Sequence, residues 1–413
     1  MEPSLSRKAK TFLRTRSPVK EIMTYADAEY LKKIGLQDKK IISFAGGWVN
    51  HPAPVEMRQA YLDIISDDKL FHASGSYTAT LGSNEAKRAI CKFEETLYGT
   101  KLNPDQIAVG LGSTQMALNL FHVLLDPGDK IALLDPTYCN YPAQIMSFID
   151  GVQILQFPVV DKETWTYNAD SKIEEFREYI LREKPKAVLL ISPDNPTSQV
   201  LSNEFVKAAL EAVTEIGSFL IVDFAYKEIV FDEKMPEYFS WAPNPNFIAL
   251  CSNSKWCRSL GRRLGWVQAT ETIVAALESS LSSSILCPDT LHQMTFARYV
   301  DLAVANENLF RYIKTLREDY KIAAERTCAA IKKHIGLPSF TPQGALYTCF
   351  NTGKNSAQFV EDTLRNTGVL LVAGWGFGNT MNQAVRLSYG PLVHNLDLID
   401  EGIEKVGQYL HSR

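Results

Sequence analysis

The sequence predicts an α/β fold in which a mostly parallel sheet carries helices on both faces and a smaller α+β region follows. Between about residues 85 and 255, short apolar runs alternate with amphipathic stretches of helical period. The apolar runs are nearly continuous and rich in β-branched residues, which is typical of parallel strands buried on both faces. After about residue 295 the pattern changes to a long charged helical stretch and then to mixed helices and strands. This change predicts a second domain.

The elements of the first region follow one another with short connections. We expect strands at 106–110, 130–135, 151–157, 186–192, 219–223 and 247–251, and helices at 114–125, 141–149, 173–183 and 203–216. In the second region we expect one long helix over about 298–333 and strands at 345–350 and 384–388. We therefore divide the chain into a large domain, 48–295, and a small domain that combines 1–47 with 296–413.

The composition limits the classes of function. The 413 residues are 46% hydrophobic and 22% charged, and the formal net charge is −4. These values are ordinary for a globular protein and give no overall attraction to nucleic acid. No apolar stretch approaches the length of a membrane span. We therefore expect neither nucleic acid nor a membrane as a partner.

Seven cysteines are scattered along the chain without a CxxC pair or a Cys/His zinc spacing. An odd number in a large chain fits reduced thiols better than a disulfide framework, so we expect a cytoplasmic protein without a metal site. The basic, hydroxyl-containing N-terminus has some features of a transit peptide. Glu2 and Glu21 favour a helical arm or a frayed terminus instead.

A lysine follows the last strand of the first region. The strand 247–251 leads into small polar residues, then Lys255, and then a loop in which Arg263 stands close to two glycines. A lysine in this position can form a Schiff base with pyridoxal phosphate (PLP), and an arginine nearby can hold the phosphate with a bidentate fork. A basic surface loop is the alternative, because lysine is among the commonest exposed residues.

Further polar residues follow the first two strands, and ligands of such sheets bind at the carboxyl ends of the strands. Ser113, Thr114 and Gln115 open a helix after the strand 106–110, where backbone N–H groups can bind an anion. A plain helix cap explains the same residues. Tyr138 follows the next strand and can stack on a flat heterocycle or pack at the rim.

Three more candidates lie further along the chain. Asn195, between two prolines, is either a fixed hydrogen-bond donor to a ring oxygen or part of an ordinary turn. Asp223 ends a strand, where it can keep a pyridine nitrogen protonated or cap a turn. Arg386 stands inside an apolar strand and needs an anionic partner, either a substrate carboxylate or an internal acid.

A dinucleotide-binding site is a competing interpretation of the first loop. Gly110 and Gly112 follow a strand, and Asp135 ends the next one. The third glycine of that motif is absent, because Gln115 occupies its place. The truncated motif also leaves the lysine loop unexplained.

Taken together, these residues resemble those of the class I/II aminotransferases, the PLP-dependent fold type I family, over nearly the whole chain. The resemblance implies a seven-stranded-type sheet in the large domain and Lys255 as the Schiff-base lysine. It also implies contacts to the cofactor from Ser113, Thr114, Gln115, Ser252 and Arg263 at the phosphate, Tyr138 on the ring, Asn195 and Tyr226 at the ring oxygen, and Asp223 at the pyridine nitrogen.

The resemblance extends to the substrate and to a partner subunit. Arg386 is similar to the clamp for the α-carboxylate, with Asn195 beside it, and Gly47 is similar to the substrate-side glycine. Tyr77 resembles the tyrosine that reaches the phosphate of the neighbouring subunit, which implies a homodimer. Two departures stand out: Ser198 replaces the usual glycine, and the stretch 48–52, which includes His51, replaces the commoner acidic-proline stretch and leaves the side-chain specificity open.

The predicted reaction transfers the amino group of an α-amino acid to a 2-oxo acid through Lys255, with Asp223 and Tyr138 as further catalytic residues. A PLP-dependent β-eliminating lyase or synthase of the same fold shares these residues and is the alternative. An aminotransferase-like domain of a transcriptional regulator would need a DNA-binding module, for which the first fifty residues leave no room. A nicotinamide dehydrogenase is the weakest alternative.

Overall fold

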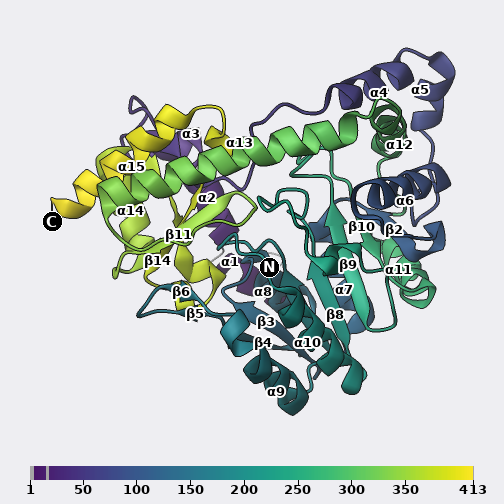
Figure 1. Ribbon diagram of the computed structural model, residues 1–413, viewed down its shortest axis with the longest axis horizontal. Coiled ribbons are helices and arrows are strands. Elements are labelled where there is room, and N and C mark those ends of the chain that lie inside the picture. The colour runs from purple at the N-terminus through teal and green to yellow at the C-terminus, as the bar shows by residue number, and fades with distance from the viewer. Residues whose placement is uncertain (1–3, 15–17, 413) are drawn as a thin grey trace.

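The computed structural model describes residues 4–14 and 18–412 and contains a seven-stranded sheet (Figure 1). From one edge to the other, the strands are β2 (Ile107–Gly110), β10 (Gly265–Gln268), β9 (Phe247–Ser252), β8 (Phe219–Asp223), β7 (Ala187–Ile191), β3 (Lys130–Asp135) and β4 (Gln153–Pro158). Strand β10 runs antiparallel to both of its neighbours, and the other pairings are parallel. The predicted α/β class with a mostly parallel sheet is confirmed, although β10 was not expected.

Helices cover both faces of this sheet because successive residues of each strand point to opposite sides. In β7, Leu189 and Ile191 pack into one apolar core, and Val188 and Leu190 pack into the other. The first core is covered by α7 (Ser113–Leu124), α8 (Asn140–Phe148) and α11 (Glu271–Ser284), and the second by α6 (Asn84–Tyr98), α9 (Ile173–Glu183) and α10 (Asn203–Glu215). All the central strands are therefore buried on both sides.

The C-terminal region has its own three-stranded sheet. Its strands are β11 (Tyr347–Asn351), β14 (Ala384–Ser388) and β13 (Val372–Ala373), with the helices α14 (Ser356–Thr367) and α15 (Leu396–His411) beside them. Strand β1 (Ile42–Ser43) pairs in parallel with β12 (Val369–Leu370). This pairing ties the N-terminal segment to the C-terminal region, far away in sequence.

The single helix predicted over about 298–333 is wrong. The structure has two helices, α12 (Thr290–Ala305) and α13 (Asn308–Ala330), separated at Glu307, whose φ of 54° is left-handed and ends the helical ladder. Helix α12 packs against α4 (Val55–Ile65) and α6, and α13 reaches α15. Figure 1 shows α13 crossing the molecule from α12 towards α14 and α15.

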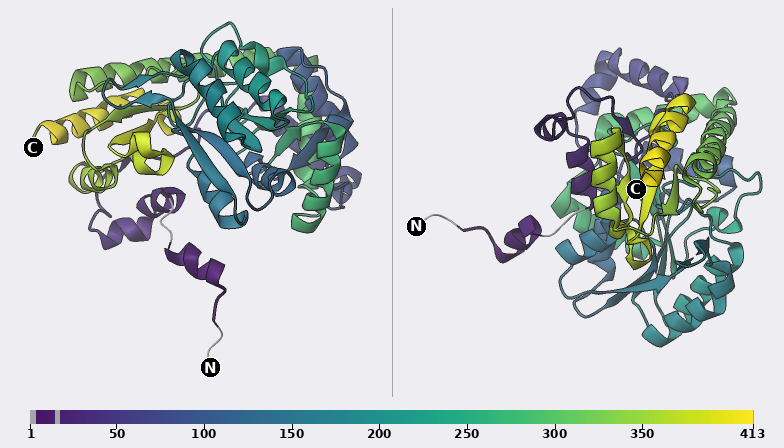
Figure 2. Two further views of the ribbon diagram at one scale, coloured as in Figure 1. Left: turned by 90° about the horizontal axis from the view of Figure 1, so that it is seen from below. Right: turned by 90° about the vertical axis from the view of Figure 1, so that its left-hand side faces the viewer.

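The N-terminal segment starts with helices that extend from the body of the molecule. Figure 2 shows α1 (Arg7–Arg14) pointing outwards, with α2 (Pro18–Tyr25) and α3 (Ala28–Lys33) closer to the rest of the chain. The predicted helical arm therefore contains helix α1; Glu2 lies outside the described residues. The remaining elements are α5 (Asp68–Ser74), β5 (Val160–Asp161), β6 (Thr166–Tyr167), the π-helix η4 (Ile331–Ile335) and the 3₁₀ helices η1 (Pro104–Gln106), η2 (Asp170–Lys172), η3 (Glu237–Ser240), η5 (Gly374–Phe377), η6 (Asn379–Met381) and η7 (Gly390–Leu392).

Two features are absent from residues 4–14 and 18–412. No helix there combines the length and apolar character that a bilayer crossing requires. The same residues contain no group of three or more His, Cys, Asp or Glu side chains arranged to hold a metal ion.

Candidate active site

A cavity of about 220 Å³ opens where the parallel strands end at their carboxyl termini. It brings together residues that are up to 364 positions apart in the chain, from Ile22 to Arg386. The predicted site residues that line it are Gly47, Ser113, Thr114, Tyr138, Asn195, Asp223, Tyr226, Ser252, Lys255, Arg263 and Arg386. Two predicted residues, Gln115 and Tyr77, lie outside this lining.

Lys255 occupies the loop that follows β9. Its Nζ donates a hydrogen bond to the carbonyl oxygen of Gly47 at 2.5 Å and lies 5.9 Å from the centre of the Tyr226 ring. Burial lowers the pKa of Lys255 to about 8, and the positive charges of Arg386 and Arg263 act in the same direction. An appreciable fraction of this amine is therefore neutral near pH 7, as a nucleophile requires.

Asp223 ends β8, an apolar run whose last residues are fully buried. Its Oδ2 accepts a hydrogen bond from the hydroxyl of Tyr141, and its Oδ1 accepts one from the backbone N–H of Ala225 at 2.9 Å. Burial raises the pKa of Asp223 to about 6 even though these bonds and the charge of Lys255 oppose the rise. The carboxylate is thus poised to hold a cation or to share a proton.

Arg386 projects from the middle of β14 and is only 3% exposed. Its Nη1 donates to Asn195 Oδ1 and its Nη2 to the carbonyl oxygen of Ala45, both at 2.9 Å. Its Nε has no hydrogen-bond partner among the described residues, and no ion pair with a described carboxylate is found. The internal acid that the sequence left open as a partner is therefore not seen, and the guanidinium is available to an anionic ligand.

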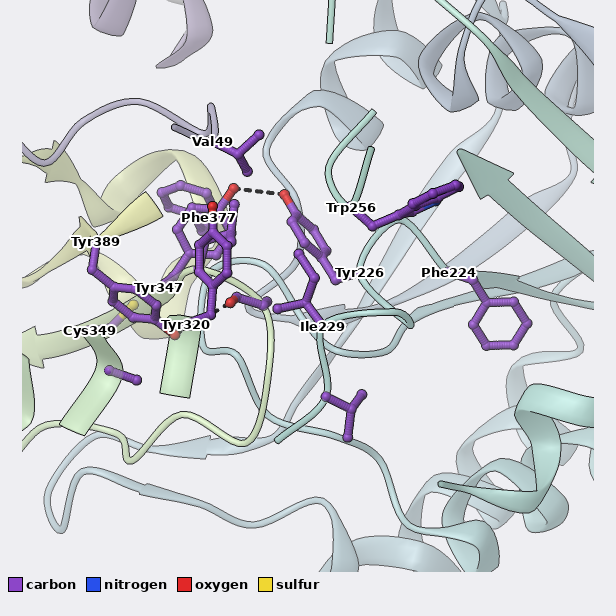
Figure 3. Packing of buried hydrophobic residues seen from close by; sticks show 14 of the residues in the cluster. Val49, Phe224, Tyr226, Ile229, Trp256, Tyr320, Tyr347, Cys349, Phe377 and Tyr389 are labelled. Carbon is purple, nitrogen blue, oxygen red and sulfur yellow. Dashed lines mark hydrogen bonds between the residues drawn. The ribbon is translucent and has the colours of Figure 1, made fainter. Parts of the chain in front are cut away.

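Two aromatic rings hold this guanidinium in place. Its central carbon lies 4.4 Å from the centre of the Tyr347 ring and 5.0 Å from that of Phe377. The hydroxyl groups of Tyr347 and Tyr226 are hydrogen-bonded at 2.7 Å, and Figure 3 shows the two rings meeting through this bond. Tyr347 thus connects Arg386 to Tyr226, whose ring lies near the amine of Lys255.

The start of α7 forms a cradle of backbone N–H groups. Its N-cap is Gly112, with a φ of 92°, and no side chain caps the helix, so the plain-cap alternative for Ser113 and Thr114 is not what the structure has. The first N–H groups of the helix are free to bind a ligand. The guanidinium of Arg263 packs against Gly112, since a Cβ there would lie 2.4 Å from its Nη2.

The other predicted residues around the cavity hold one another in place. The Ser252 hydroxyl donates to the Ser254 hydroxyl at 2.8 Å and accepts from the Ser254 backbone N–H. Ser198, which stands where glycine is usual, has a φ of 59°, the left-handed conformation that favours glycine. Its hydroxyl accepts a hydrogen bond from the backbone N–H of Tyr347 at 3.0 Å. A glycine would adopt this backbone conformation more easily, but it could not form that bond.

Gln115 and Tyr77 point elsewhere within this chain. The Gln115 side chain accepts a hydrogen bond from the backbone N–H of Leu111 at 2.9 Å and donates to Asn119. Only its backbone is left to serve the cradle. Tyr77 is 81% exposed and lies outside the cavity of its own chain.

His51 is held in the protein interior. Its Nδ1 is 2.9 Å from the hydroxyl of Tyr320, and its Nε2 is 3.1 Å from the carbonyl oxygen of Trp256. Burial lowers the pKa of His51 to about 4, so the ring is neutral at physiological pH. With both nitrogens engaged and no place in the cavity lining, His51 is a structural residue.

Sequence reasoning did not assign roles to two tyrosines of the site. Tyr141 binds Asp223, and Tyr347 binds Tyr226 and covers Arg386. Tyr141 stands three positions after Tyr138, at the start of the helix α8 that follows the same strand end, so its position gave a usable signal. Tyr347 lies inside a strand of the C-terminal region, where a buried tyrosine reads as ordinary core.

Comparisons with known proteins identify the family of the chain. The family described as "Aminotransferase class I and II" matches residues 39–405. The aspartate aminotransferase of Thermotoga maritima is 26% identical over 390 residues, which cover 94% of this chain and 95% of that protein. The asparagine–oxo-acid transaminase of Streptococcus mutans is 24% identical over 407 residues, which cover 95% and 98%.

Solved structures show the same fold. A single mutant of the Thermus thermophilus aspartate aminotransferase has a TM-score of 0.83 at 22% identity, covering 98% of this chain and 100% of that chain. The aspartate aminotransferase of Thermotoga maritima has a TM-score of 0.80 at 24% identity, with the same coverage. The predicted fold type, PLP cofactor and transaminase activity are confirmed at the level of the family. The chain therefore belongs to the class I and II aminotransferases, which are PLP-dependent.

Proposed function

We propose that the protein moves the amino group of an α-amino acid to a 2-oxo acid and that Lys255 both holds the cofactor and carries the proton. The observation that supports this most directly is the meeting of Lys255, Asp223 and Arg386 in one buried cavity. An amine of lowered pKa, a buried carboxylate and an arginine without an acidic partner are the three groups that this reaction needs. Each group comes from a different strand end or strand, so their convergence is a property of the fold.

The residues present fit PLP. When bound, it supplies an aldehyde for the covalent link and a ring that accepts electrons from the substrate. The uncapped N-terminus of α7 and the guanidinium at Gly112 fit a phosphate group, and the buried carboxylate fits a protonated pyridine nitrogen. The residues that we assign to the cofactor are Ser113, Thr114, Gln115 through its backbone, Tyr138, Asn195, Asp223, Tyr226, Ser252, Lys255 and Arg263, with Tyr77 from a partner subunit.

Lys255 is suited to act first as the covalent anchor and then as a base. Its lowered pKa leaves part of the amine unprotonated at neutral pH, so it can accept a proton from the substrate Cα and return it to another carbon. The hydrogen bond to the Gly47 carbonyl keeps the amine beside the substrate side of the cavity. A fixed amine at this distance reduces the entropy lost in the proton transfer.

Asp223 and Tyr138 assist from the other side of the site. Tyr141 and the Ala225 N–H hold the Asp223 carboxylate in one orientation. A cation bound there would favour the ionised form of this carboxyl group, whose pKa is raised in the protein alone. Tyr138 lines the same cavity with its ring edge-on to Tyr141, 5.5 Å between centres, and offers a flat apolar wall to a ring.

Arg386 orients the substrate. Asn195 and the Ala45 carbonyl take one N–H each from Nη1 and Nη2, which fixes the plane of the guanidinium. Its remaining donors are directed to the α-carboxylate in our proposal, with Gly47 beside them. Fixing that carboxylate also fixes the direction of the Cα–H bond towards Lys255.

We further propose a homodimer, in which Tyr77 completes the site of the partner subunit. The support is that this tyrosine is 81% exposed and does not line the cavity of its own chain. Our division into a large domain, 48–295, and a small domain, 1–47 with 296–413, remains a prediction. We also propose a cytoplasmic location, with the seven free cysteines as support.

Single-turnover spectroscopy separates amino transfer from the lyase alternative. An amino acid added alone to the PLP-loaded protein should abolish the absorbance of the lysine-bound cofactor and release one equivalent of oxo acid, and a 2-oxo acid should restore it. A lyase would release ammonia repeatedly and would need no acceptor. Borohydride reduction before the reaction should place the cofactor mass on the Lys255 peptide. Label on another lysine, or continuous ammonia release, would contradict the proposal.

A further inference from the structure

The cavity lining has three cationic side chains among the residues that the structure describes: Lys255, Arg263 and Arg386. The proposed function uses all three. Lys255 bonds to the aldehyde carbon of the cofactor, Arg263 binds its phosphate, and Arg386 binds the α-carboxylate of the substrate. In this described lining no fourth cation is left for a second carboxylate on the substrate side chain. The acidic residue in the lining, Asp223, adds negative charge.

Two other arginines of the lysine loop are engaged away from the cavity. Arg258 Nη1 donates to Asn50 Oδ1 at 3.0 Å and to the His51 carbonyl oxygen at 2.9 Å. The guanidinium carbon of Arg262 lies 5.1 Å from the centre of the Tyr61 ring. Both arginines lie outside the cavity lining.

Apolar side chains form the mouth of the cavity instead. Ile22 and Met23 contribute from α2, and Trp48 from the segment that follows β1. The Trp48 ring packs directly on Gly46, because a Cβ at that glycine would lie 2.1 Å from the ring. Met23 is 63% and Trp48 is 38% exposed, so both offer apolar surface that a substrate side chain could cover.

Two stretches of the chain beside Tyr77, which we expect to face the partner's site, contain no cationic side chain. The Thr290 hydroxyl donates to the Ser76 carbonyl oxygen at 2.7 Å, so the chain around 290 lies beside the tyrosine segment. In the stretches 73–82 and 279–291 the sole charged side chain is Asp289. A second subunit that placed these stretches at the cavity would therefore add no countercharge for an acidic substrate.

We infer that the amino donor carries an uncharged, apolar side chain, aromatic or large aliphatic, and that Ile22, Met23 and Trp48 form the surface that receives it. This inference rests on the proposed function, which assigns the three cations. A side-chain carboxylate packed against this surface would lose part of its hydration without gaining a charged partner. An apolar side chain would instead gain by leaving water. We expect the 2-oxo acid acceptor to carry an uncharged, apolar side chain as well, because both half-reactions use one cavity.

Leucine, asparagine and aspartate provide a matched test because they have similar shapes and differ in polarity and charge. We would measure the second-order rate constant for loss of the bound cofactor's absorbance with each of them and with phenylalanine. Leucine and phenylalanine should react about 100-fold faster than aspartate, with asparagine in between. Aspartate reacting as fast as leucine would overturn this inference and leave the proposed function standing. No reaction with any amino acid of a broad panel would overturn the proposed function itself.

A charge added at the cavity mouth tests the same idea from the protein side. Met23 is exposed on a surface helix, so Met23→Lys should fold. It should raise the ratio of the aspartate rate to the leucine rate by about 5- to 10-fold, as a partly exposed ion pair would. Met23→Gln, of similar length without charge, is the control: it removes the apolar contact without giving aspartate a charged partner, so it should raise the ratio less than Met23→Lys does. Equal ratios in the two variants would remove Met23 from the receiving surface.

Discussion

The carboxylate of Asp135 accepts a hydrogen bond from the hydroxyl of Thr380 at 2.5 Å, across 245 positions of the chain. The same carboxylate accepts bonds from the backbone N–H groups of Asn379 at 3.0 Å and of Thr380 at 3.2 Å. Asp135 ends β3 of the central sheet, and the bound loop directly follows Phe377, which packs over Arg386. One residue of the large sheet thus positions a wall of the arginine site.

Replacing this carboxylate should loosen the loop. Asp135→Ala leaves the buried N–H of Thr380 and the partly buried N–H of Asn379 without this acceptor, at a cost of about 1–3 kcal/mol for a fully buried group. We therefore expect a lower melting temperature, faster hydrogen exchange in residues 377–381 and a weaker affinity for amino acids. Thr380→Val removes only the hydroxyl and should have a smaller effect on all three. Unchanged exchange in Asp135→Ala would show that the loop is held by other contacts.

The ionisation of Lys255 should be visible in the cofactor-free protein. Its pKa is lowered from 10.5 to about 8, so the reactive free amine should increase as the pH rises through 8. Labelling with a neutral amine reagent, followed by quantification of the Lys255 peptide, should give a midpoint near pH 8. Arg386→Ala removes a neighbouring positive charge and should raise the midpoint, whereas Arg386→Lys should preserve it. A midpoint near 10 in the unaltered protein would rule out the lowered pKa.

Asp223 should stabilise the holoenzyme while it destabilises the cofactor-free protein. Its pKa is raised from 3.8 to about 6, so the ionised form opposes folding and the stability falls as the pH rises through 4 to 6. In the cofactor-free protein, Asp223→Asn should therefore melt at a higher temperature above pH 6, and the difference should shrink towards pH 4. The same variant should bind PLP more weakly. A lower melting temperature at pH 7 would contradict this account.

Arg386 should matter for the reaction more than for cofactor binding. Arg386→Ala removes a contact that orients the substrate, and a loss of roughly 3–4 kcal/mol of transition-state stabilisation corresponds to a rate decrease of several hundredfold. We expect PLP to bind with nearly unchanged affinity while single-turnover rates with amino acids fall. Arg386→Lys keeps the charge without the planar fork and should recover only part of the rate. Full activity of the alanine variant would exclude the carboxylate role.

Complementation between subunits tests the position of Tyr77. A Tyr77→Phe chain and a Lys255→Ala chain should form hybrid dimers in which one site has neither change. Activity should therefore rise when the two inactive or impaired proteins are dissociated and reassembled together. If isolated hybrids regain nothing, Tyr77 acts within its own subunit. A chain carrying both substitutions, mixed with the unaltered chain, provides the control, because each hybrid site then has one change.

The strand ends could be predicted from the sequence because long apolar runs have a definite end and because charged or polar residues directly after them must find partners. Lys255, Asp223 and Asn195 were identified in this way and do lie in one cavity. Tyr347 could not be identified in this way, because its role depends on a hydrogen bond to Tyr226, 121 positions away. Tertiary packing alone creates that contact.

Strand β10 and the break at Glu307 show a second limit. β10 is four residues long and starts at a glycine, so its sequence reads as the continuation of a loop. Glu307 lies between two asparagines in a stretch whose helical character continues on both sides, and a left-handed φ at a glutamate has no sequence signature. In both places, the neighbouring elements decide the conformation.

The antiparallel strand β10 has a consequence for how the cofactor is carried. Ser252 and Gly265 are Cα partners, so the loop 253–264 leaves and re-enters the sheet at the same place. That loop contains Lys255 and Arg263, and the antiparallel pairing of β9 with β10 brings its two ends together at the same edge of the sheet. Lys255 and Arg263, which we assign to the cofactor, therefore lie in one loop whose two ends are paired strands of the sheet. Arg386 comes from β14 in the C-terminal region. A hinge motion of that region would therefore change the distance between Arg386 and a cofactor that is fixed to the central sheet.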